Sequence, residues 1–364
     1  MLINQVISHI EEFAPTSYAE DFDNVGLLVG EANTEVTGVL ITLDTLEAVV
    51  DEAIEKRCNL IVSFHPIIFS GLKKLNGKNY VERTVIKAIQ NNIAIYAIHT
   101  ALDNQYKGVN DMIAEKLNLT NRQILIPRKK SIKKLTTFVP TANSEELRNA
   151  LFEAGAGSIG NYDNCSFNLE GRGSFKPNEE ANPTIGRKGE VHYEEETQIG
   201  LTFPAHLESK ILRTLFSTHP YEEVAYEVTT LDNMHQHLGM GMIGELPEAM
   251  AEEDFLKLVK NTFGCGCIRH SELRDKPVQK VAVLGGSGSF AIDNARAAGA
   301  DIFITADLKY HDFYKAGKNL VLADIGHYES EQFTKNLLHS YLTKKIPNFA
   351  LILADTNTNP IKYI

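Results

Sequence analysis

Apolar segments of strand length alternate with helical segments in two separate stretches of this chain, and this alternation limits the fold more than any other feature. Strands that alternate with helices form sheets covered by helices, which is the definition of the α/β class. In the first stretch, residues 36–119, we expect strands at 39–43, 59–64 and 93–98 and helices at 47–56, 81–90 and 109–117. In the second, from residue 278 onward, we expect strands at 280–284, 301–305, 319–323 and 350–353 and a helix at 290–297.

The middle of the chain breaks this rhythm and is rich in Gly, Asn, Thr and Glu. We interpret its order of elements as β-α-β-β-α-β, which is typical of a ferredoxin-like domain. The predicted organisation is an α/β core formed by residues 1–130 and 236–364, with an inserted α+β domain at 131–235. Its expected strands are 135–139, 166–169, 191–193, 197–203 and 224–228, and its expected helices are 144–154 and 205–217. The basic run at 128–134 and a loop at 232–240 are expected to bound it.

The two halves of the predicted core resemble each other. Residues 44–66 and 286–307 each pass from the end of a strand through a helix into another apolar strand. We interpret this as a weak internal duplication, with two half-sheets facing a shared cleft; chance similarity between α/β units is the alternative. Ligands of open α/β sheets bind at the C-terminal ends of the strands, so this cleft is where a site is expected.

Composition narrows the class of protein. The 364 residues carry a net charge of −11, and no basic block offsets it, which argues against binding to a nucleic-acid backbone. The four cysteines form no CxxC pair and suggest reduced thiols in the cytoplasm. The N-terminal residues follow helical spacing rather than a signal-peptide pattern, and no apolar run approaches the ~18–20 residues that span a bilayer.

The most informative local pattern is the pair His327 and Glu331, four residues apart at the expected start of a helix. This spacing places both side chains on one helix face, one turn apart. An imidazole and a carboxylate so placed can bind one divalent cation, or each bind one of an adjacent pair. A surface helix whose His and Glu face water is the alternative.

Two further loops follow predicted strands and carry possible ligands. His65 is presented by a turn that Pro66 fixes, and Asp103 ends the segment that begins at His99. Together His65, Asp103, His327 and Glu331 form a nitrogen and oxygen set suited to Zn²⁺, Fe²⁺ or Mn²⁺. His99 is either a further ligand or a residue that supports one. Each residue taken alone could equally be an ordinary polar group at a strand end.

Three other features lie near these residues in the sequence. Asp324 could orient His327. The Gly-rich segment 285–289 could hold a phosphate through its backbone N–H groups, although a tight turn explains it equally well. In the polar segment that follows the strand at 301–305, the side chains that could act as a general acid or base are Asp307, Lys309 and His311.

In combination these motifs resemble the Nif-three-like (Nif3-like) family, whose members carry the name GTP cyclohydrolase 1 type 2 homologue. The matching segments cover most of the predicted core: 22–30 (FDNVGLLVG), 64–66 (FHP), 99–103 (HTALD), 285–288 (GGSG), 305–311 (TADLKYH) and 326–331 (GHYESE). The insert resembles the PII/CutA-like domain of long bacterial members through 155–162 (GAGSIGNY), 171–177 (GRGSFKP) and 219–223 (HPYEE).

The resemblance implies a dinuclear metal site inside a toroidal homohexamer, with His65, Asp103, His327 and Glu331 at family ligand positions. The family usually has two adjacent histidines before the proline, whereas this chain has Phe64 in the first place. Phenylalanine cannot bind a metal, so one of the two metal positions loses a ligand, which His99 or water could replace. One or two metal ions per chain are therefore expected.

These expectations lead to a main hypothesis and two alternatives. The main one is a metal-dependent hydrolase of a nucleotide-like or other phosphate-bearing small molecule. The first alternative is a non-enzymatic, metal-binding regulatory assembly whose inserted domain senses a ligand, and the substitution at Phe64 motivates it. The second is a purely structural α/β scaffold, which stoichiometric metal in the purified protein would exclude.

Overall fold

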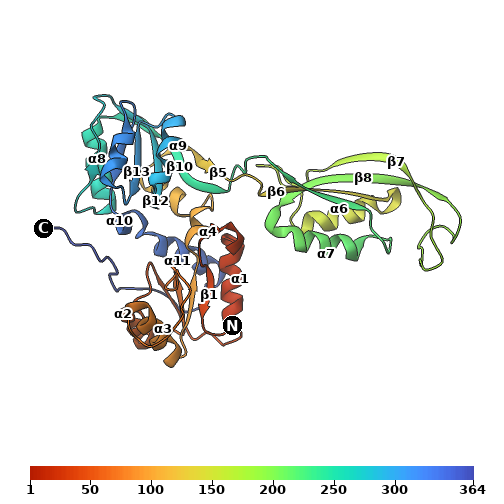
Figure 1. Cartoon of the computed structure of the whole chain (residues 1–364), viewed down its shortest axis with the longest axis horizontal. Coiled ribbons are helices and arrows are strands. Elements are labelled where there is room, and N and C mark those ends of the chain that lie inside the picture. The colour runs from red at the N-terminus through yellow and green to blue at the C-terminus, as the bar shows by residue number, and fades with distance from the viewer. The chain divides into compact units, whose positions relative to one another are not determined.

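The computed structural model describes all of residues 1–364, and the chain divides into two compact units (Figure 1). Unit 1 contains two separate stretches of sequence, Met1–Ile126 and His237–Ile364. Unit 2 is the continuous stretch Pro127–Gln236 between them. No helix in the chain is long and apolar enough to cross a membrane. The α/β class predicted from the sequence is confirmed, because both units combine helices with sheets.

Unit 1 contains a five-stranded sheet in which four strands run parallel. Its strands, in spatial order, are β1 (Gly26–Val29), β4 (Ala94–Ala97), β3 (Leu60–Ser63), β2 (Val39–Thr42) and β15 (Leu351–Leu353). Only β1 pairs with its neighbour in the antiparallel direction. Strands β2, β3 and β4 are fully buried, as expected for a parallel sheet with both faces covered. Two helices pack on one face, α2 (Glu47–Glu55) and α3 (Tyr80–Gln90).

The second sheet of unit 1 has six strands. They are, in spatial order, β11 (Arg269–His270), β14 (Val321–Asp324), β13 (Ile302–Ala306), β12 (Val278–Ser287), β10 (Gly239–Met250) and β5 (Thr120–Pro127). The central strands β12, β13 and β14 are parallel and mostly buried. Each sheet takes one edge strand from the other stretch of sequence, because β15 joins the first sheet and β5 joins the second. Each stretch of sequence therefore contributes an edge strand to the sheet that the other stretch mainly forms.

One hydrophobic core joins both sheets of unit 1. Successive strand residues alternate between faces: Ile41 and Val62 enter this shared core, whereas Leu40 and Ile61 pack under α2 and α3. Residues of β12, β13 and β14 enter the same shared core. The remaining helices of unit 1 are α1 (Ile3–Phe13), α4 (His99–Asp103), α5 (Val109–Lys116), α8 (Glu252–Phe263), α9 (Ile292–Ala297), α10 (His327–Glu331) and α11 (Thr334–Lys345).

Unit 2 is a four-stranded antiparallel sheet with two helices. Along the chain its elements are β6 (Ile132–Pro140), α6 (Ser144–Glu153), β7 (Phe167–Phe175), β8 (His192–Pro204), α7 (Glu208–Thr218) and β9 (Tyr226–Leu231). The spatial order is β7-β8-β6-β9. The apolar residues of α6 and α7, among them Leu147, Leu151, Ile211 and Leu215, form its core with the sheet.

Several local predictions need correction. The two strands expected at 191–193 and 197–203 are one strand, β8, because the run of three glutamates between them stays paired with β7 on the surface of the sheet. Lys133 and Lys134 lie in β6 rather than in a linker. The segment that begins at His99 is the short helix α4, not a loop. Strands β1, β5 and β10 and helix α8 were not expected from the sequence pattern.

Candidate metal centre

Three predicted ligands meet in unit 1, and we call His65, His327 and Glu331 the three-ligand cluster. The Nε2 atoms of the two histidines lie 3.4 Å apart. Glu331 Oε2 lies 3.1 Å from each of these nitrogens. The cluster joins residues from the two stretches of sequence, since His65 and His327 are 262 positions apart.

The end of β3 positions His65. The β3 sequence Leu-Ile-Val-Ser is fully buried and holds the chain firmly up to Ser63. Beyond it, the Ser63 hydroxyl donates to the His65 carbonyl oxygen at 2.8 Å, and the His65 N–H donates to the Leu43 carbonyl at 2.9 Å. Pro66 follows and ends the strand. The His65 side chain is therefore presented at the C-terminal edge of a parallel sheet, where ligands usually bind.

Helix α10 positions His327 and Glu331 on one face, one turn apart. It begins after Gly326, whose φ of 95° is readily available only to glycine. Ser330 fixes the helix against β12, because its hydroxyl accepts a hydrogen bond from the Gly286 N–H at 2.9 Å and donates to the His327 carbonyl at 2.8 Å. Glu331 is buried, while His327 is partly accessible.

The Gly-rich segment 285–289 makes room for this helix, and two of the backbone N–H groups that could hold a phosphate are already bonded within the protein. The Gly285 N–H donates to Asn110 Oδ1 at 3.0 Å, and the Gly286 N–H donates to Ser330, so neither group is available. Strand β12 also runs on through both glycines. A Cβ at Gly286 would collide with Glu331 Oε1, so glycine at this position allows the carboxylate to approach the strand.

Each histidine around the site donates its Nδ1–H to an aspartate. The pairs are His65 with Asp44 at 2.8 Å, His327 with Asp307 at 2.7 Å, and His99 with Asp23 at 2.8 Å. Such a bond fixes the ring orientation and leaves Nε2 free to face the site, as is usual for metal-binding histidines. The proton is assigned to Nδ1 of each ring because the carboxylate oxygen that faces it can only accept a hydrogen bond.

The predicted supporting role of Asp324 is wrong. Its Oδ2 accepts hydrogen bonds from Arg269 and from the Leu308 N–H, and its Oδ1 accepts one from the Gly326 N–H. Asp307, considered only as an acid or base, is the residue that supports His327. The other two candidates of that segment, Lys309 and His311, are exposed.

Asp103 lies in α4 beside the three-ligand cluster, partly accessible as a residue but with its Oδ1 atom buried. Burial and the negative charge of Glu331 raise the pKa of Asp103 well above its usual range. Asp103 Oδ1 and Glu331 Oε2 are buried oxygens that accept no hydrogen bond, since the close approaches of the two imidazoles to Glu331 lack hydrogen-bond geometry. Buried carboxylate oxygens without donors are costly unless a cation satisfies them.

His99 lies outside the three-ligand cluster but next to it. Its ring centroid is 5.2 Å from that of His65. The backbone φ of His99 is 32°, an unusual conformation for a non-glycine residue and one that often occurs at functional sites. Phe64 packs against both histidines, with centroid distances of 4.9 Å to His65 and 5.6 Å to His99, and it is completely buried.

The charges of the cluster are tightly coupled. Burial alone would lower the pKa of His65, but the neighbouring carboxylates of Asp44 and Glu331 outweigh burial and raise it to about 9. The same balance, with Asp307 and Glu331, raises the pKa of His327 to about 11. Burial would raise the pKa of Glu331, but the two imidazoles lower it. The site thus holds positive charge next to Glu331 when no metal is bound, and a divalent ion would replace the Nε2 protons.

The residues present fit a divalent cation. Ligand atoms around a four-coordinate Zn²⁺, with bonds of about 2.0–2.1 Å, are roughly 3.3 Å apart. The separations in the three-ligand cluster, 3.1, 3.1 and 3.4 Å, agree with this value. Two imidazole nitrogens and a carboxylate oxygen suit zinc, iron and manganese equally. The geometry therefore indicates a metal site without selecting the metal.

Sequence reasoning missed three supporting residues. Asp44 directly follows the predicted strand at 39–43, so its position at a strand end was an available signal. Asp23 lies in the FDNVGLLVG segment, whose pattern gives its carboxylate no evident role. Thr358, near the C-terminus, donates its hydroxyl to Asp44 Oδ2 at 2.6 Å, and no pattern in the sequence pointed to it.

Comparison with known proteins identifies the family of this chain. The model of the family Duf34/NIF3 (NGG1p interacting factor 3) matches residues 1–360. The chain belongs to this family. Among its relatives, a Bacillus subtilis protein named GTP cyclohydrolase 1 type 2 homolog is 38% identical over 368 aligned positions, which cover 99% of this chain and 98% of that protein. The resemblance seen in the motifs is thereby confirmed.

Solved structures of Duf34/NIF3 relatives have the same fold. The crystal structure of a Bacillus cereus protein related to NIF3 is 38% identical and superposes with a TM-score of 0.89, covering 100% of this chain and 99% of that chain. A Staphylococcus aureus protein structure is 32% identical, with a TM-score of 0.80 and the same coverage. The likeness therefore extends over both units.

Proposed function

We propose that this Duf34/NIF3 protein binds a divalent metal ion at His65, His327 and Glu331 and uses it in hydrolysis. The observation that carries the proposal is the convergence of two Nε2 atoms and one buried carboxylate oxygen within 3.4 Å of one another. Asp44 and Asp307 hold the two rings from behind. When bound, such an ion supplies Lewis acidity for the activation of water.

Asp103 and His99 are the remaining groups of this site. We propose that Asp103 contributes to a second, weaker metal position, because its Oδ1 is buried and accepts no hydrogen bond. His99, held by Asp23, would complete that position or move a proton near it. Phe64 occupies the place where the family usually has a histidine, and its buried ring offers no ligand. We therefore expect one metal position of high affinity and one of low affinity.

The substrate class rests on the relatives rather than on the site. Relatives that match the whole chain are named GTP cyclohydrolase 1 type 2 homolog, and the proposed substrate is accordingly a nucleotide-like or other phosphate-bearing small molecule. The test is a panel of nucleotides and phosphoesters incubated with metal-loaded protein. Hydrolysis that Glu331→Gln abolishes would support the proposal. A fully metal-loaded protein that hydrolyses no member of the panel would contradict hydrolysis while leaving metal binding intact.

We also propose a domain organisation and an oligomeric state for this chain. Unit 2 would be an inserted ferredoxin-like domain, since its elements follow the order β-α-β-β-α-β. Assembly into a cytoplasmic homohexamer follows from the family resemblance. Light scattering of the purified chain tests the assembly, and a monomer or dimer at micromolar concentration would contradict it.

A further inference from the structure

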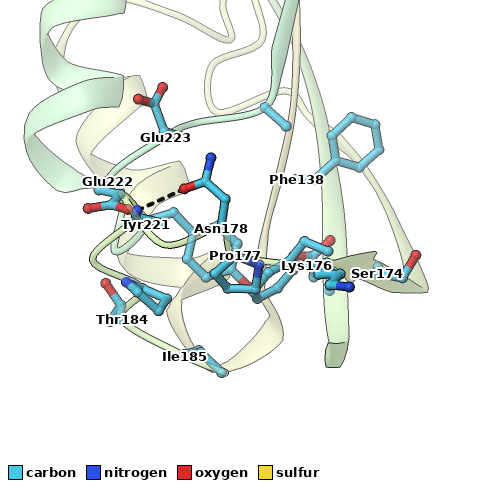
Figure 2. A pocket seen from close by; sticks show the side chains of 16 residues that line it. Phe138, Ser174, Lys176, Pro177, Asn178, Thr184, Ile185, Tyr221, Glu222 and Glu223 are labelled. Carbon is cyan, nitrogen blue, oxygen red and sulfur yellow. Dashed lines mark hydrogen bonds between the residues drawn. The ribbon is translucent and has the colours of Figure 1, made fainter. Parts of the chain in front are cut away.

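Unit 2 contains a pocket. The residues that line it are distant in the sequence from every residue of the metal centre. It encloses about 480 Å³, which is within the range of pockets that hold small molecules. Its walls come from β6, from the end of β7 and the loop that follows, from β8, and from the segment after α7. Figure 2 shows the side chains that line it.

Aromatic rings form part of the wall. Phe138, Phe175 and Tyr221 all line the pocket. The rings of Phe175 and Tyr221 pack edge to face with their centroids 5.6 Å apart. Aromatic faces attract cations as well as apolar groups, through the negative potential above each ring.

A carboxylate lines the same pocket and is only partly satisfied. Glu196 Oε1 accepts a hydrogen bond from the Tyr221 hydroxyl at 3.0 Å, and Oε2 accepts none within the protein. This carboxylate packs directly over the backbone of β7, because a Cβ at Gly173 would collide with Glu196 Oε2. The absence of a side chain at Gly173 thus leaves room for the Glu196 carboxylate.

The pocket is acidic and its charges are not balanced. Glu196, Glu222 and Glu223 line it together with a single cation, Lys176. None of these four side chains forms an ion pair with another residue of the chain. Glu222 Oε1 accepts a hydrogen bond from the Asn182 N–H at 2.7 Å, so this carboxylate helps to hold the loop. The carboxylates of Glu196 and Glu223 are the ones that could pair with a cationic ligand.

The loop that closes the pocket is fixed in place. Besides the bond to Glu222, the Thr184 hydroxyl donates to the Pro220 carbonyl at 2.8 Å. Within the loop, Asn178 Oδ1 accepts the Ala181 N–H at 3.0 Å. A pocket formed before binding loses less conformational entropy when a ligand enters.

We propose that this pocket binds a small organic cation, namely an amine or guanidinium group carried on an apolar or aromatic body. The cation would pair with Glu196, and the body would pack against Phe138 and Phe175. Apolar walls with a few placed polar groups are typical of small-molecule sites, and an unbalanced carboxylate beside aromatic rings selects positive charge. This binding function is separate from the metal centre.

The first experiment compares three probes that differ in charge. Saturation-transfer NMR and calorimetry on the full chain would use phenethylamine, its neutral analogue 2-phenylethanol and its anionic analogue phenylacetate. We expect phenethylamine to bind and phenylacetate to show no binding at the same millimolar concentration. Equal binding of phenethylamine and phenylacetate, or no binding of phenethylamine, would overturn the proposal.

The second experiment locates the site. Glu196→Gln keeps an oxygen for the Tyr221 hydroxyl but removes the charge, and we expect it to weaken phenethylamine binding about tenfold. Glu170→Gln is the matched control, because Glu170 is an exposed residue of β7 that does not line the pocket. Equal affinities of Glu196→Gln and wild type, or an equal loss in the control, would overturn the assignment. Glu331→Gln should leave this binding unchanged, which separates it from the metal centre.

Discussion

The two sides of the metal centre differ in how many ligands they offer. On one side His65, His327 and Glu331 converge, with both rings held by aspartates. On the other side the Oδ1 atom of Asp103 is buried and accepts no hydrogen bond, and His99 is held by Asp23. There the side chain of Phe64, which offers no ligand atom, packs against the rings of His65 and His99.

This difference indicates that the support of a histidine by an aspartate is not what sets the strength of a metal position. The aspartate behind His99 is as close as those behind the two histidines of the three-ligand cluster. What distinguishes the sides is the number of atoms with lone pairs that face a common point. We therefore expect one strong metal position and one weak one.

The largest effect is expected on the three-ligand side. Glu331→Gln removes the only negative ligand of the cluster, and we expect it to weaken metal binding by more than about a hundredfold, beyond the loss typical of a supporting residue. Competition with a chromophoric chelator measures this. Glu329→Gln is the control, since Glu329 is buried on the same helix but lies outside the cluster. Similar affinities of the two variants would contradict the assignment.

The second largest effect is expected at the weaker metal position, on the side of Asp103 and His99. Phe64→His adds an imidazole beside His65 and His99, and we expect the metal content to rise from about one to about two equivalents per chain. Elemental analysis of protein purified without chelators measures the content. Phe64→Leu controls for altered packing and should stay near one equivalent. An unchanged content in Phe64→His would mean that another residue already completes that position.

A smaller effect tests the support of His65. Thr358→Val removes the hydroxyl bonded to Asp44 and keeps the size of the side chain, and we expect a loss in metal affinity of about tenfold. Thr358→Ser should restore the affinity. Thr356→Val is a matched control in the same C-terminal segment, because its hydroxyl bonds to Glu52 and not to Asp44. If both valine variants weaken metal binding equally, the segment acts only by its general packing.

The smallest effect is on stability. Asp103→Asn removes a carboxyl group whose ionised form is repelled by Glu331, and we expect the metal-free protein at pH 8 to gain about 1 kcal/mol in free energy of unfolding. Chemical denaturation measures this change. Asp111→Asn is the control with the opposite sign, because buried Asp111 forms an ion pair with Arg122 at 2.9 Å. A destabilised Asp103→Asn variant would show that this carboxylate is already satisfied without metal.

Much of the fold of unit 1 could be predicted because its central strands are strongly apolar. The runs at 39–43, 59–64 and 93–98 contain β2, β3 and β4, which are buried on both faces. Strands β1, β5 and β10 were missed since they lie toward the edges of their sheets and contain glycine or polar residues. Their pairing depends on partners distant in the sequence, which local pattern does not reveal.

The candidate ligands could be named from the sequence, but their roles could not. Position at strand ends and the four-residue spacing pointed to His65, His327 and Glu331. Which aspartate supports which histidine depends on side-chain directions at the site, and the sequence pattern points to Asp324 although Asp307 is the residue bonded to His327. The bond from Thr358 to Asp44 spans 314 positions, and only the folded chain brings these residues together.

The most direct test of the account is a zinc titration of the metal-free wild-type chain against a competing chelator. The account predicts one tightly bound equivalent per chain, lost in Glu331→Gln, and a second equivalent that binds only weakly. Two equivalents of equal affinity would contradict the difference between the two sides of the site. No binding in competition with the chelator would contradict the metal centre itself.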